Sequence, residues 1–175
     1  SEANEDTLTV YNENGVAQTD GILTASQLTG LGLAQGLDYS GLEQLTLELG
    51  DVANPFTIVG THAGTTQLNT YDGADTVTIL AVSGRTIINT GNDADIIRVG
   101  NLGNTVNGIG ALLTIDGQAG NDVLIMDDSG DINANIGTLT ATTLTGLDMT
   151  EGIHYANLET LNIALGNGGN QFVII

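Results

Sequence analysis

The sequence predicts an all-β chain that folds as a parallel β-helix, or β-solenoid, with coils of about 20 residues. Three observations predict this fold. Apolar residues make up 41% of the 175 residues but aromatic residues only 3%, so the apolar content is aliphatic. Short apolar runs recur about every ten residues, and the chain contains an internal repeat. The abundant Gly, Thr and Asn residues favour strands and tight turns over helix interiors.

The internal repeat has an offset of 116 residues. Residues 21–58 match residues 137–174 without a gap, with 18 of 38 positions identical. The identical residues are mostly Leu, Gly, Thr, Tyr and Phe, which suit a core and its turns. A stacking unit is duplicated in this way, whereas an active site need not be. We therefore predict one solenoid domain over residues 1–175, with about one and a half copies of the repeat. Glu43 and Glu159 also match, and we interpret this repeated position as structural.

The strands expected between the two copies follow a regular rhythm. Each is a run of four to six residues that alternates or is continuously apolar and ends at Gly, Asn or Asp. The predicted strands are 55–59, 66–70, 76–80, 86–90, 96–99, 112–116 and 123–127. Residues 28–35 and 144–151 fit this rhythm less well. For them we expect a wider coil, a side excursion or a short helix.

The charge of the chain narrows the classes of partner. There are 21 acidic residues, two arginines and no lysine, which gives a net charge of −19. Such a surface repels nucleic acids and anionic membranes. Two carboxylates about 4 Å apart repel by roughly 4 kcal/mol at an effective dielectric constant near 20. If the carboxylates cluster, a divalent cation is the obvious counter-ion; the alternative is that the acidity serves only solubility or a salty habitat.

Several turns carry a glycine and aspartate pattern. Residues 117–125 read Gly-Gln-Ala-Gly-Asn-Asp-Val-Leu-Ile, and the frames at 70–78, 90–98 and 166–174 are degenerate versions. The pattern resembles the glycine-rich nonapeptide of RTX (haemolysin-type) calcium-binding proteins, with Gln118 at the position of that nonapeptide's second glycine. The resemblance implies Ca²⁺ held between stacked turns by aspartates and main-chain carbonyls. Pro55 occupies the aspartate position of one frame, so we expect no calcium at that turn.

The predicted calcium ligands are the acidic and amide residues of these turns. They are Asp72, Asp75, Asn92, Asp93, Asp95, Asp116, Asn121, Asp122, Asp127 and Asp128. Asp75 and Asp95 are 20 residues apart and should stack on one edge of the solenoid. The alternative is that these aspartates only stabilise turns, and that the run at 127–131 is a solvated acidic loop.

The sequence predicts a calcium-stabilised structural repeat module of an extracellular adhesin, matrix protein or surface filament. We expect no enzymatic activity, no nucleic acid partner and no membrane insertion, because no run is long and apolar enough to span a bilayer. The expected partners are further copies or adjacent repeats, end to end, because open solenoid ends recruit strands. Two alternatives remain: a carbohydrate-active β-helix enzyme, and an ice-binding solenoid that uses Thr-x-Thr rows such as Thr76 and Thr78.

Overall fold

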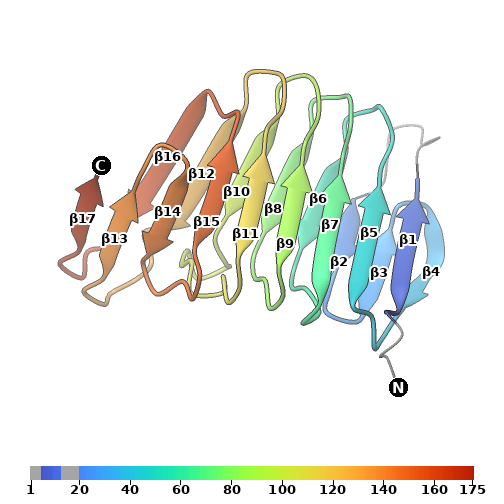
Figure 1. The fold of residues 1–175 in the computed structure, drawn as a ribbon, viewed down its shortest axis with the longest axis horizontal. Helices are drawn as coiled ribbons and strands as arrows, with labels where there is room; N and C mark the ends of the chain where they lie inside the picture. Colours follow the sequence, from blue (N-terminus) through green and yellow to red (C-terminus); the bar gives the residue numbers. More distant parts are fainter. Residues whose placement is uncertain (1–4, 13–19) are drawn as a thin grey trace.

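Two mostly parallel β-sheets lie face to face in the computed structural model, which describes residues 5–12 and 20–175 (Figure 1). We call the nine-stranded sheet the front sheet and the eight-stranded sheet the back sheet. From one end to the other, the front sheet contains β1 (Thr7–Tyr11), β5 (Gln44–Glu48), β7 (Thr65–Asn69), β9 (Thr86–Asn89), β11 (Leu113–Asp116), β15 (Ile153–Ala156), β14 (Thr143–Gly146), β13 (Ile136–Leu139) and β17 (Gln171–Ile174). The back sheet contains β4 (Leu33–Asp38), β3 (Gln27–Gly30), β2 (Gly21–Leu23), β6 (Pro55–Ile58), β8 (Thr76–Ile79), β10 (Ile96–Val99), β12 (Val123–Asp128) and β16 (Thr160–Leu165).

From β4 to β13 the chain alternates between the two sheets, so each of these coils contributes one strand to each sheet. Equivalent positions of successive coils lie 21, 20 and 27 residues apart, as the hydrogen bonds from Asn54 to Asp75, from Asp75 to Asp95 and from Asp95 to Asp122 show. The predicted solenoid-like architecture of stacked parallel strands is therefore present. The seven predicted strands between residues 55 and 127 coincide with β6 to β12.

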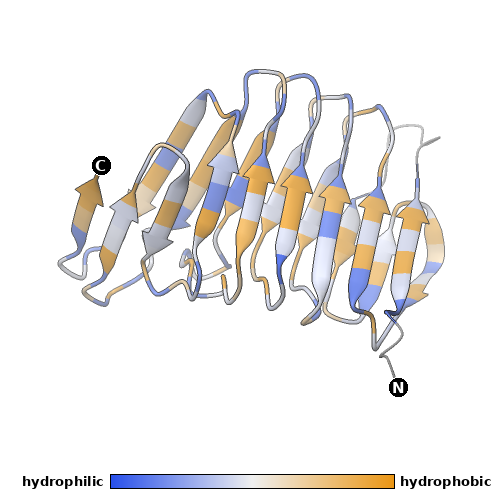
Figure 2. Ribbon diagram, in the orientation of Figure 1, coloured by the Kyte–Doolittle hydropathy of each residue, from blue (hydrophilic) through white to orange (hydrophobic). Residues whose placement is uncertain are grey.

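The core lies between the sheets and is aliphatic. Inward-facing residues alternate with outward-facing ones along each strand, as the orange bands in Figure 2 show. Leu47, Leu68, Ile88 and Ile115 form one fully buried row across the front sheet. This stacking of like residues explains why so few aromatic side chains are needed.

The short helix considered for residues 28–35 and 144–151 is wrong, because no helix occurs in the described residues. Both segments belong to antiparallel hairpin-like excursions, β2–β3–β4 and β13–β14–β15. In each, three successive residues take positive φ values: Gly30, Leu31 and Gly32 at 78°, 51° and 75°, and Gly146, Leu147 and Asp148 at 82°, 54° and 59°. Such a turn reverses the chain and excludes a helix. The structure also has no helix that could cross a membrane in its described part.

Candidate functional site: a ladder of buried carboxylates

The turns between front and back strands form the upper edge of the solenoid in Figure 1, and they carry most of the predicted ligands. On this edge Asp75, Asp95 and Asp122 each immediately precede a back strand. All three are buried, with exposed fractions of 1%, 1% and 0%. We call these three residues the acidic ladder. The prediction that Asp75 and Asp95 stack on one edge is confirmed.

Each carboxylate of the acidic ladder binds the main chain of the preceding coil. Asp75 Oδ1 accepts the N–H of Asn54 at 2.8 Å, Asp95 Oδ1 accepts the N–H of Asp75 at 2.8 Å, and Asp122 Oδ1 accepts the N–H of Asp95 at 2.9 Å. Glu159 Oε2 continues the series by accepting the N–H of Asp122 at 2.7 Å. The side chains thus connect successive coils where the two sheets are joined.

The second oxygen of each ladder carboxylate has no hydrogen-bond partner. Oδ2 of Asp75, Asp95 and Asp122 is buried and unpaired within the described residues. The Thr70 hydroxyl lies near Asp75, but it donates its proton to the Thr90 carbonyl at 2.8 Å. A buried oxygen without a partner costs free energy, and an ionised one costs more. The ladder is therefore incomplete unless a proton or a cation neutralises it.

Burial makes these carboxyl groups weak acids in the fold. It raises the pKa of Asp75 to about 7 and that of Asp95 to about 6. Main-chain donors oppose the increase in both cases, and the neighbouring ladder carboxylate adds to it. Burial also raises the pKa of Asp122, and the negative charge of Glu159 adds to this increase.

The other predicted ligands on this edge lie outside the ladder and connect turns to one another. Asn92 Nδ2 donates to Asp72 Oδ1 at 2.6 Å, and Asp93 Oδ2 accepts the N–H of Gly73 at 3.1 Å. Asp116 Oδ1 accepts from Gln118 N–H at 2.9 Å and from Asn157 Nδ2 at 2.7 Å. Asn121 is exposed beside Asp122.

The last two predicted ligands lie on the opposite, lower edge, at the end of β12. Asp128 is fully buried, and its Oδ1 accepts the N–H of Val106 at 3.2 Å, while its Oδ2 is unpaired. Asp127 Oδ1 accepts the N–H of Ser129 at 3.0 Å. The structure therefore separates Asp127 and Asp128 from the other eight residues. Within the described residues no three acidic or histidine side chains converge into a group that could hold a metal ion.

Two ladder positions were missed by the sequence analysis. Asn54, not Pro55, precedes β6 and occupies the position equivalent to Asp75, with its Nδ2 donating to the Gly50 carbonyl at 2.8 Å. Glu159 ends the series, and its counterpart Glu43 accepts the N–H of Asp6 at 2.7 Å. The signals that could have identified these two positions were the identity of Glu43 with Glu159 and that of Asn54 with Asn170 between the copies.

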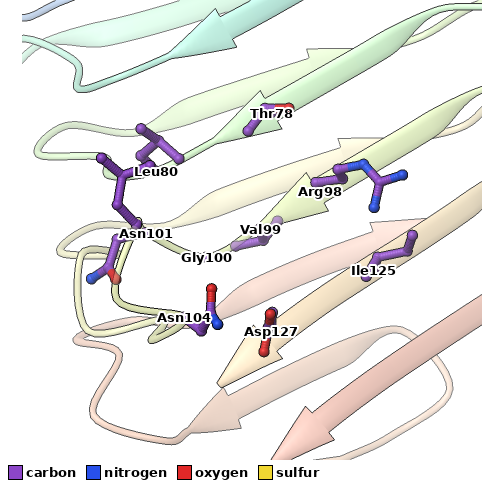
Figure 3. Close-up of a pocket in the computed structure, with 10 residues that line it drawn as sticks. Thr78, Leu80, Arg98, Val99, Gly100, Asn101, Asn104, Ile125 and Asp127 are labelled. Atoms are coloured by element: carbon purple, nitrogen blue, oxygen red, sulfur yellow. The ribbon is translucent and has the colours of Figure 1, made fainter. Parts of the chain in front are cut away.

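A shallow pocket of about 290 Å³ lies on the outer face of the back sheet, near the lower edge (Figure 3). It forms where the coil of 27 residues has a long loop of residues 100–112 between β10 and β11, against residues 80–85 in the preceding coil. Its lining is mixed and includes one acidic residue: Thr78, Leu80, Arg98, Val99, Gly100, Asn101, Leu102, Asn104, Ile125 and Asp127.

No protein-family model, curated protein or solved structure matches this chain.

Proposed function

We propose that this chain is a calcium-stabilised structural repeat module of an extracellular adhesin, matrix protein or surface filament. The observation that carries the proposal is the acidic ladder, in which three stacked and fully buried carboxylates each keep one oxygen without a partner. Calcium prefers carboxylate and carbonyl oxygens, and both are present at this edge. The likeness of residues 117–125 to the RTX nonapeptide points to the same ion.

The described residues supply no counter-charge to the ladder. The chain has no lysine, and neither Arg85 nor Arg98 makes an ion pair within the described residues. The carboxylates must therefore be neutralised by protons at low pH or by a cation at neutral pH. Because no group of three acidic side chains converges, a bound calcium ion would take most of its oxygens from main-chain carbonyls and water.

Calcium dependence is tested by thermal unfolding followed by circular dichroism at pH 8, with millimolar calcium, with equal magnesium and with chelator. We expect calcium, but not magnesium, to raise the melting temperature by roughly 5 °C or more. Asp95→Asn should abolish most of this increase, because it removes one ladder charge yet keeps the oxygen that accepts the N–H of Asp75. Asn170 shows that an amide fits in this position, because it directly precedes β17 and its Oδ1 accepts the N–H of Asn135 at 3.0 Å.

Asp51→Asn is the matched control, because Asp51 is exposed in the turn between β5 and β6, on the same edge of the solenoid, and is not among the predicted ligands. It should retain the calcium effect. Identical melting curves with calcium and with chelator would refute the calcium part of the proposal and leave the aspartates as turn residues.

The enzyme alternative receives little support from the pocket on the back sheet. Glycoside hydrolysis generally requires two carboxyl groups across the scissile bond, and Asp127 is the single acidic residue in that lining. The ice-binding alternative requires a flat row of threonines. The outward row across β6, β8, β10 and β12 instead reads Thr57, Thr78, Arg98 and Ile125.

A structural role also suits the ends of the solenoid. We propose that the module acts among further copies of its own repeat, joined end to end, outside the cell, without nucleic acid or membrane insertion. The net charge of −19 disfavours nucleic acid and anionic lipid surfaces.

A further inference from the structure

The 116-residue repeat recurs in the structure strand for strand. β1 pairs with β5 in the register Leu8↔Leu45, and β12 pairs with β16 in the register Leu124↔Leu161. The pairing of β2 with β6 recurs as that of β13 with β17, again displaced by 116 residues. Both antiparallel excursions also keep their registers. The repeat is therefore a unit of strand pairing as well as of sequence.

Each repeat changes the sheet in which its strands lie. β5 belongs to the front sheet but its counterpart β16 to the back sheet, whereas β6 belongs to the back sheet and its counterpart β17 to the front sheet. The cause is arithmetic: one repeat, β2 to β12, has eleven strands, and residues 20–175 are described without a gap. The three strands of each antiparallel excursion share one sheet and the remaining strands alternate, so a repeat with an odd number of strands begins the next repeat in the opposite sheet. The same pairing is thus rebuilt after a half turn about the solenoid axis.

The equivalence identifies the kind of coil that would cover β16 and β17. In the first copy, β5 and β6 are covered by the coil β7–β8, which pairs with both. In the second copy, β16 pairs only with β12 and β17 only with β13 among the described strands. β13 and β17 form the far left of the front sheet in Figure 1. We call β16 and β17 together the C-terminal face.

Burial of side chains follows the same difference. Ile58 is 0% exposed in the first copy, while its counterpart Ile174 is 73% exposed. Phe56 is buried, whereas Phe172 is half-buried. Leu45, Leu47 and Leu49 are fully buried, but their counterparts on β16 are half-buried: Leu161, Ile163 and Leu165. The C-terminal face thus presents apolar residues in the arrangement that β7 and β8 cover elsewhere.

We infer that the C-terminal face is the docking surface for a coil of the β7–β8 type, supplied by a following 116-residue repeat and mounted with the front and back sheets exchanged. A strand equivalent to β7 adds to β16, and one equivalent to β8 adds to β17. This inference rests on the structural part of the proposed function and is independent of calcium.

A second, separate copy of the chain does not fit this surface in the same way. Its outer strands at the other end are β1 and β4, whose counterparts are β12 and β15. In the second copy those strands are covered by β10 and β11. The end formed by β1 and β4 therefore takes a β10–β11 coil, and the C-terminal face takes a β7–β8 coil. The two ends complement a neighbouring repeat and not each other.

The test is an extended chain in which residues 1–175 are followed directly by a second stretch of residues 60–175, which continues the repeat in phase. Ile174→Lys is introduced into both the original and the extended chain. In the original chain the side chain is exposed, so we expect the melting temperature to change by less than about 1 °C. In the extended chain the position becomes buried like Ile58, so we expect a decrease of roughly 5 °C or more.

Val173→Lys is the matched control, because its counterpart Thr57 points outward and pairs with Thr78 of the next coil. It should be tolerated in both chains. All four variants are measured with calcium and with chelator, so that a failed calcium effect is seen separately from failed docking. Equal tolerance of Ile174→Lys in both chains would overturn the inference. So would a dimer of the original chain that Ile174→Lys dissociates, because the partner would then be a second copy.

Discussion

Ile58 and Ile174 occupy the same position in two copies of one repeat, yet the first is buried and the second is largely exposed. Their local surroundings are alike: Ile58 lies opposite Leu23, and Ile174 lies opposite Leu139. What differs is the next coil, which covers β6 and not β17. Burial in this solenoid is therefore conferred by the neighbour on the axial side, as expected for a one-dimensional stack of repeats.

The largest predicted difference between the copies concerns these isoleucines. Ile58→Ala should cost about 3 kcal/mol of unfolding free energy, because it leaves a cavity in a closed core. Ile174→Ala should cost less than about 0.5 kcal/mol. Urea unfolding of both variants measures the difference. Equal costs would mean that the C-terminal face is covered in solution.

The acidic ladder offers a second comparison, between Asp122 and its counterpart Asp6. The N–H of Asp122 donates to Glu159 at 2.7 Å, and the N–H of Asp6 donates to Glu43 at 2.7 Å. Asp122 is buried next to the coil that contains Asp95, whereas Asp6 is exposed. In chelator we expect stability to rise as the pH falls from about 8 to about 5. The reason is that the folded pKa values of Asp75, about 7, and Asp95, about 6, exceed their unfolded value of 3.8.

The sign follows from proton binding. Between the unfolded and folded pKa values the folded chain holds more protons, so protonation stabilises it, and that stability is lost as the pH rises through the folded pKa. Calcium should flatten this trend, because it stabilises the ionised carboxylates. Asp122→Asn should weaken both effects and Asp6→Asn neither, as measured by melting temperature across the pH range. Stability that decreases on acidification in chelator would contradict the ladder electrostatics.

The smallest expected difference concerns two tyrosines. Tyr39 and Tyr155 each donate a hydrogen bond to a threonine carbonyl fifteen residues earlier, Thr24 and Thr140, at 2.5 Å. Tyr39 is buried, and burial raises its pKa to about 12, whereas Tyr155 is half-buried. We expect Tyr39→Phe to cost about 1 kcal/mol and Tyr155→Phe somewhat less. Denaturant unfolding compares the two, and a larger loss at Tyr155 would be inconsistent with the burial pattern.

Much of the fold could be predicted from sequence because its signals are local. Alternation of apolar residues and turn residues at ten-residue spacing placed β6 to β12, and the offset of 116 residues identified the repeat. The excursions at residues 28–35 and 144–151 could not be predicted, because left-handed Leu31 and Leu147 look like ordinary apolar residues. Both leucines are buried, and Leu31 lies against Gly21, so packing offsets their backbone strain.

The candidate site was only partly predictable. The nonapeptide frames identified all three aspartates of the acidic ladder, but not the shift by which Asn54 stands in place of Pro55. That shift depends on where β6 begins, which the frame does not specify. Nor did the frames separate Asp127 and Asp128 from the ladder. These two residues end β12, which runs from the upper edge, where Asp122 lies, to the lower edge of the solenoid.

The odd number of strands in the repeat also determines how many repeats of a longer array could present the same residue to one surface. Any outward-facing residue encoded once per repeat, such as Arg98, would appear alternately on opposite sides of the array. With eleven strands shared by two sheets, and strands about 4.8 Å apart, one repeat advances the axis by roughly 26 Å. Identical contact points facing one target would then recur at about twice that distance, so avidity toward a flat surface would draw on half of the repeats and leave the other half for a second surface.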